Sequence, residues 1–279
     1  MIARVTGAAT RGLLVAIVVA TPALLLPDVG PDSTQVTLLV AMVAAILTFI
    51  EYNAEAPSIV EFRDAAPFNR LRFLSLFLTI CVLTILMRGL SEPSLFAGAI
   101  ASVGTIVGNA MDFPYSPVRL LIVMLPSETA PELVNLIRVA AGIAYLAALI
   151  TLAAFIFLVR VLGWPSRKRV FNVWINLPLF DPTAGGDVLT RLNRDARINI
   201  ALGCLLPFLI PALLKLSTHV IDPIALTNHQ ALIWTVAAWA FLPASVIMRG
   251  IAMHRIAEMI ADQRRRAFTK DQDAEFQPA

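Results

Sequence analysis

The stretch Val139–Val159 reads VAAGIAYLAALITLAAFIFLV, a run of 21 residues without a charged side chain. A helix of about 20 residues crosses the hydrocarbon core of a bilayer, which is about 30 Å thick. Backbone amides in lipid must be paired within their own segment, so such a run is predicted to be a helix. The stretch therefore predicts a transmembrane span, and much of the chain repeats its pattern.

Five further runs have similar length and apolarity. Together with the first, they place the predicted spans at about residues 12–29, 35–52, 71–90, 139–159, 198–216 and 230–248. The 279 residues are 58% apolar and 15% charged, and their mean hydropathy is +0.78. Because a soluble domain is about a quarter charged, a water-soluble globular protein is excluded. We predict an all-α, polytopic membrane protein built as a bundle of six transmembrane helices.

Lysine and arginine are distributed unevenly about these spans. If the N-terminus lies inside the cell, 18 of the 22 basic residues fall on the inner side. The positive-inside rule therefore predicts that both termini are cytoplasmic, facing an anionic inner leaflet. An arginine-rich, alanine-rich composition is typical of GC-rich bacterial genomes, so we expect a bacterial inner membrane.

Residues 95–125, between the third and fourth spans, are apolar but do not read as a further crossing. Leu95–Met111 is uncharged, and the prolines of the connector that follows cannot continue a helix. A full crossing here would also reverse the side on which the later arginines lie. We expect a broken pair of short helices, either re-entrant or lying at the outer face. Its Gly104 and Gly108 form a GxxxG motif, which indicates close helix packing or, as the alternative, a dimer contact.

The loop at residues 162–199 is the longest hydrophilic segment and the surface on which we expect a protein partner to bind. Asp187 follows a Gly-Gly turn and is predicted to be the N-cap of a helix. The predicted partner-binding residues are Arg167, Lys168, Arg169, Trp174, Asp181, Asp187, Arg191 and Arg194. The segment 250–279 is predicted to be a cytoplasmic amphipathic helix, which lies on the inner leaflet, and a tail.

No reaction motif, metal-ligand spacing or nucleotide-binding signature is present, so we assign no catalytic, metal or cofactor residues, and we expect no nucleic-acid partner. Two acidic pairs are the exceptions worth testing. Glu51 and Glu55 would share one helix face if the second span continued to residue 56, and Asp181 with Asp187 flanks the Gly-Gly turn.

These observations favour a non-catalytic accessory, assembly or scaffold protein that acts through its inner loops and tail. A transporter or channel for a small solute is the alternative, suggested by prolines in three spans and by the broken element. A lipid-modifying enzyme that uses one of the acidic pairs is the third hypothesis.

Overall fold

The computed structural model describes all residues except 1, 166–175, 182–184, 218–227 and 276–279. Within the described part, all regular structure is helical: α1 (Ile2–Leu25), α2 (Pro31–Asn53), α3 (Phe68–Ser91), α4 (Leu95–Met111), α5 (Pro117–Val123), α6 (Pro131–Arg160), α8 (Val188–Ser217) and α9 (His229–Glu275). Six of these, α1, α2, α3, α6, α8 and α9, are long and apolar enough to cross a membrane. The predicted helical membrane bundle is confirmed.

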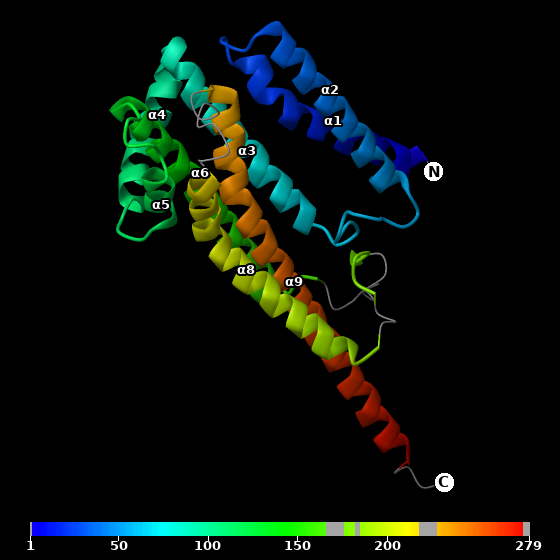
Figure 1. Ribbon diagram of the computed structural model, residues 1–279. Helices are drawn as coiled ribbons and strands as arrows, with labels where there is room; N and C mark the ends of the chain where they lie inside the picture. Colours follow the sequence, from blue (N-terminus) through cyan, green and yellow to red (C-terminus); the bar gives the residue numbers. More distant parts are fainter. Residues whose placement is uncertain (1, 166–175, 182–184, 218–227, 276–279) are drawn as a thin grey trace.

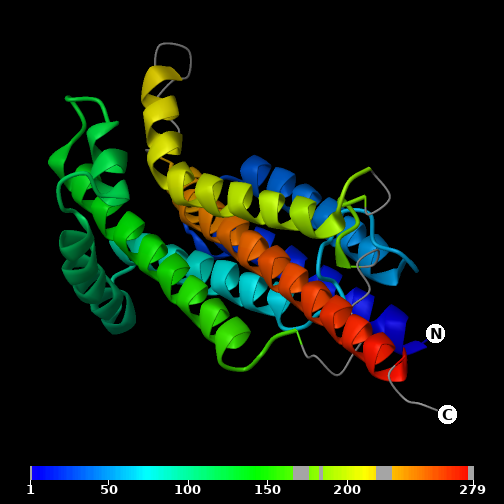
Figure 2. The ribbon, with the colours of Figure 1, turned by 90° about the horizontal axis from the view of Figure 1, so that it is seen from below.

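The spans pack around two helical pairs. α1 and α2 form one hairpin, and α8 and α9 form a long antiparallel pair (Figure 1). α3 contacts α1 as well as α6 and α9, and α6 packs between α9 and α4. α1 begins and α9 ends toward the same side of the bundle (Figure 2), although the last turns of α9 extend well beyond the start of α1 (Figure 1). We call this the terminal end.

Two hydrophobic cores hold the helices together. The first joins α3, α6 and α9 through fully buried residues such as Leu83, Ala140 and Val236. The second lies at the terminal end and is rich in aromatic residues, among them Phe68 and Trp164, whose rings stack with centroids 6.0 Å apart. This second core fixes the segment between α2 and α3 against α6 and α9.

Residues 95–125 form two short helices, α4 and α5, separated by a turn, as the sequence predicts. α4 lies along α6, and its glycines face that helix. A Cβ atom on Gly142 of α6 would lie 2.5 Å from the Cα atom of Gly108, and one on Gly104 would lie 2.7 Å from the Val139 side chain. Only glycine allows this approach, so both glycines of the GxxxG motif serve a contact within the chain.

α9 differs from the prediction because it has no break after the sixth span. It continues to Glu275, and its apolar residues beyond the span are buried in the second core, with Ala252 and Met253 both 0% exposed. The prediction that this apolar face lies on the leaflet is therefore wrong. The chain supplies its own apolar partner, chiefly α8, so the face is not left for lipid.

Candidate functional site

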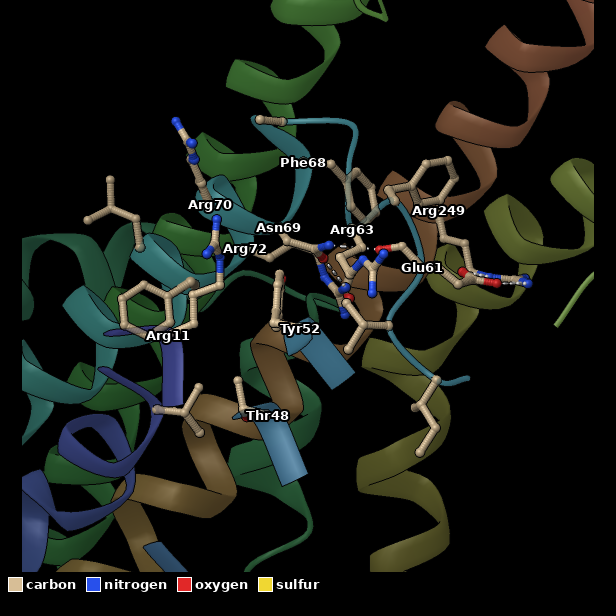
Figure 3. A pocket seen from close by; sticks show the side chains of 18 of the residues that line it. Arg11, Thr48, Tyr52, Glu61, Arg63, Phe68, Asn69, Arg70, Arg72 and Arg249 are labelled. Atoms are coloured by element: carbon tan, nitrogen blue, oxygen red, sulfur yellow. Dashed lines mark hydrogen bonds and ion pairs between the residues drawn. The ribbon is translucent and has the colours of Figure 1, made fainter. Parts of the chain in front are cut away.

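A cavity of about 900 Å³ lies at the terminal end, lined by α1, α2, α3, α9 and the loop from α2 to α3 (Figure 3). This size is within the range of pockets that bind small ligands. Its lining is unusual in charge, because it holds five arginines and a single carboxylate: Arg11, Arg63, Arg70, Arg72 and Arg249, with Glu61. We call it the arginine pocket.

The loop that forms one wall is held by two side chains that cap backbone groups. The Glu51 carboxylate accepts hydrogen bonds from the backbone N–H groups of Ile59, at 3.0 Å, and Val60, at 3.1 Å. In the opposite direction, the Arg63 guanidinium donates to the carbonyl oxygens of Glu51, at 2.9 Å, and Ala54, at 2.8 Å. These carbonyls belong to the end of α2, which otherwise lacks partners. Arg63 therefore holds the wall of the pocket in place, with its guanidinium bonded to backbone carbonyls.

Glu61, the single carboxylate in the lining, also has a partner within the described chain. Glu61 receives two hydrogen bonds from Arg249 of α9, at 2.6 and 2.8 Å, in a bidentate ion pair (Figure 3). Arg249 donates a further bond of 3.0 Å to Asn199 of α8. Glu61 thus forms its ion pair with Arg249 and joins the loop to both long helices, and none of the other pocket arginines lies within 4.0 Å of its carboxylate.

Arg72 is the group for which the chain provides least compensation. Its guanidinium lies over the rings of Phe68 and Phe241, at 5.4 and 5.9 Å, and donates one 3.2 Å hydrogen bond to Asn69. Its Nε atom is buried and has no hydrogen-bond partner among the described residues. No described carboxylate lies within 4.0 Å of it. A desolvated cation in this state costs free energy, so the site has the electrostatics of an anion-binding pocket.

Two further arginines add unpaired positive charge. Arg11 of α1 lies over the ring of Tyr52, 4.7 Å from its centroid, and Arg70 is exposed at the start of α3. Neither has a carboxylate partner within the described part of the chain. Tyr52 lines the same cavity as Arg11, Arg63 and Arg72.

The partner-binding residues predicted from the sequence do not gather in this pocket. Four of them, Arg167, Lys168, Arg169 and Trp174, lie outside the described residues. Asp181 is exposed, Arg191 lies 4.9 Å over the ring of Phe180, and Arg194 is an exposed residue 3.3 Å from Asp195. The structure therefore places these residues on the surface around the start of α8.

Asp187 is the N-cap of α8, as predicted, because one of its carboxylate oxygens accepts a 3.2 Å hydrogen bond from the Thr190 backbone. The other oxygen accepts a 2.8 Å bond from Arg264 of α9. This bond from Arg264 holds the pKa of the Asp187 carboxyl below its ordinary value. Both oxygens have a structural role.

The predicted pairing of Glu51 with Glu55 on one helix face is wrong. α2 ends at Asn53, so Glu55 lies beyond the helix, and the Glu51 carboxylate turns to the loop amides. Among the described residues, no group of three or more His, Cys, Asp or Glu side chains is placed to hold a metal ion.

From the sequence, the pocket arginines were counted only to predict the orientation of the chain. One signal was available, since Arg72 falls just inside a predicted span, where charge is costly. Comparisons with protein families, with characterised proteins and with solved structures find no match.

Proposed function

We propose that this protein is a non-catalytic membrane protein whose arginine pocket binds an anionic group. The observation that carries the proposal is Arg72, a partly buried residue that lines the cavity, with one side-chain hydrogen bond and no carboxylate in an ion pair with it among the described residues. An anion in the pocket would supply the negative charge that this guanidinium lacks. Basic pockets between transmembrane helices on the cytoplasmic side are used in this way to bind lipid headgroups.

The non-catalytic assignment is supported by what the acidic residues do. Glu51 caps a loop, Glu61 pairs with Arg249, and Asp187 caps a helix. Each of these three carboxylates stabilises the fold through the hydrogen bonds named above. None of the three pairs with a second carboxylate as an acid and a base would. This leaves recognition as the activity best supported by the pocket.

The shape of the long helices supports an accessory role. α9 is about 70 Å long at 1.5 Å per residue, more than twice the hydrocarbon thickness, and it extends with α8 beyond the span (Figure 1). We place this extension, the pocket and both termini in the cytoplasm of a bacterial cell, on the support of the arginine distribution. The surface at the start of α8, with Arg191 and Arg194, is the place where a protein partner would bind.

Transport of a solute is supported less well. The prolines that suggested it do lie within helices, in α1, α8 and α9. However, the described residues between α3, α6 and α9 form a packed and largely apolar core, whereas a solute path needs polar groups along its length.

Thermal unfolding in a neutral detergent tests the proposal. We expect an anionic phosphate ligand, either pyrophosphate or phosphatidic acid, to raise the melting temperature of the wild-type protein but not that of Arg72→Gln. Arg88→Gln is the matched control, because Arg88 lies on the same helix at its other end and pairs with Glu92. If neither ligand acts through Arg72, the proposed function is wrong.

A further inference from the structure

We infer that the ligand of the arginine pocket is a membrane amphiphile with a phosphate headgroup, which enters sideways from the bilayer. This inference rests on the proposed anion-binding function and names the class of ligand. It is carried by the distribution of apolar side chains around the pocket, which is independent of the arginines themselves.

The charge of the pocket favours phosphate over carboxylate. Arg11 of α1 and Arg72 of α3 line the same cavity, and neither has a carboxylate within 4.0 Å in the described chain. A phosphate monoester carries a charge of about −1.5 to −2 at neutral pH, so one such group compensates two guanidinium groups, whereas a carboxylate compensates one. The planar guanidinium also matches phosphate oxygens in a bidentate manner.

The apolar part of the pocket lies toward the middle of the membrane on three different helices. Leu14, Leu74 and Leu242 line the cavity, and they are 40%, 49% and 51% exposed. Each is farther from the terminal end than the arginine of its own helix. At 1.5 Å per residue, Leu14 lies about 4.5 Å beyond Arg11 along α1, and Leu74 lies about 3 Å beyond Arg72 along α3.

The same order holds on α9, where Leu242 lies about 10 Å deeper than Arg249. The cavity thus continues from the arginines past leucine side chains toward the middle of the bundle, while Ile59 and Leu179 line it on the loop side. In the proposed binding mode, the acyl chains of the ligand follow these leucines into the bilayer. A soluble phosphate compound would contact only the arginines, whereas an amphiphile would contact both the arginines and the leucines.

Binding measurements on the full chain in nonionic detergent test the inference. The probes are phosphatidic acid, phosphatidylcholine with the same acyl chains, and glycerol 3-phosphate, which is the headgroup without chains. We expect phosphatidic acid to bind at least about tenfold more tightly than either of the others. Arg72→Gln should lose about tenfold or more of that affinity, as is usual for a charged hydrogen bond, and Arg88→Gln should lose none.

A bulky residue at the rim tests the entry route. Leu74→Trp is expected to weaken phosphatidic acid binding severalfold, because the indole occupies the rim of the cavity. Leu205→Trp is the matched control, since Leu205 of α8 is 53% exposed and does not line the pocket. A phosphatidic acid that carries a photoreactive group on its chain should label peptides containing Leu14, Leu74 or Leu242 in the wild-type protein, which needs no variant to fold.

The outcomes separate this inference from the proposed function. If glycerol 3-phosphate binds as tightly as phosphatidic acid and Arg72→Gln abolishes both, the pocket binds anions but the amphiphile inference is wrong. If phosphatidic acid binding is unchanged in Arg72→Gln, the lipid is only part of the annulus and both proposals are wrong. Labelling confined to peptides from the other helices would also overturn the inference.

Discussion

Two arginines that line the same cavity are expected to change stability in opposite directions when each is replaced by methionine. Methionine keeps the length of the side chain and removes the charge. Arg72 has no carboxylate partner, whereas Arg249 forms a bidentate pair with Glu61. Comparing the stability of the two variants therefore distinguishes an arginine that would bind a ligand from an arginine that stabilises the fold.

The magnitudes follow from the contacts of each residue. Burying an unpaired ion costs several kcal/mol, and at Arg72 this is offset by two ring contacts, of about 0.5–2 kcal/mol each, and by one charged hydrogen bond, of about 1.5–3 kcal/mol. We expect Arg72→Met to be neutral or to raise the free energy of unfolding by about 1–2 kcal/mol, which is about 2–6 °C in Tm.

Arg249→Met has the opposite effect because it leaves Glu61 unpaired. The Glu61 side chain is 10% exposed, and that of Arg249 is 29% exposed. Losing one partner of a buried pair costs about 3–5 kcal/mol, and partial exposure of Arg249 reduces this to about 2 kcal/mol. We therefore expect Tm to fall by about 4–8 °C.

Thermal unfolding after thorough removal of lipid measures both effects, with tryptophan fluorescence as the readout, since Trp164 and Trp239 are buried. Phosphatidic acid at a hundred times its Kd should then stabilise the wild-type protein by about 2.7 kcal/mol and leave Arg72→Met unchanged. If both variants lose stability equally in the lipid-free state, Arg72 is a structural residue and the reasoning about the pocket fails.

Three further outcomes are expected. Gly142→Leu should lower the free energy of unfolding by about 1–3 kcal/mol through overpacking, because its Cβ atom would lie 2.5 Å from the Cα atom of Gly108. Gly98→Ala, with nothing within 4 Å, should not lower it, and equal melting curves for the two variants would contradict this. Arg264 lowers the pKa of Asp187 from its ordinary 3.8, so their contact stabilises the fold above that value and is lost as the pH falls through the lowered pKa; amide exchange at the start of α8 should accelerate only in strong acid, and acceleration near neutral pH would refute it. A periplasm-active reporter inserted between α5 and α6 should be active, and one at the C-terminus silent; the reverse would invert the orientation.

Much of the fold was accessible from the sequence. Each of the six spans is a local property, because the free energy of transferring a helix into lipid is nearly a sum over its own residues. The break between α4 and α5 was equally local, since prolines stop helices wherever they occur. The N-cap at Asp187 depends only on residues that are close in the chain, since its carboxylate bonds to the backbone of Thr190, and it too was predicted correctly.

The arginine pocket was not accessible in this way. Glu61 and Arg249 are 188 positions apart, and nothing in either neighbourhood indicates that they form a pair. Likewise, the amphipathic pattern after residue 249 indicates only that one face of the helix is apolar, and either lipid or protein can cover such a face. In the structure this face is covered by protein, because α8 packs against α9.

The sequence by itself determined that this chain is a helical membrane bundle, how many long apolar spans it has and about where each lies in the chain, because hydrophobic transfer and backbone pairing act within each segment. Only the tertiary structure decided which arginines remain unpaired, because charge compensation depends on distances between segments. The three-dimensional packing gives Arg63 and Arg249 partners within the fold and leaves Arg72 without an ion pair among the described residues.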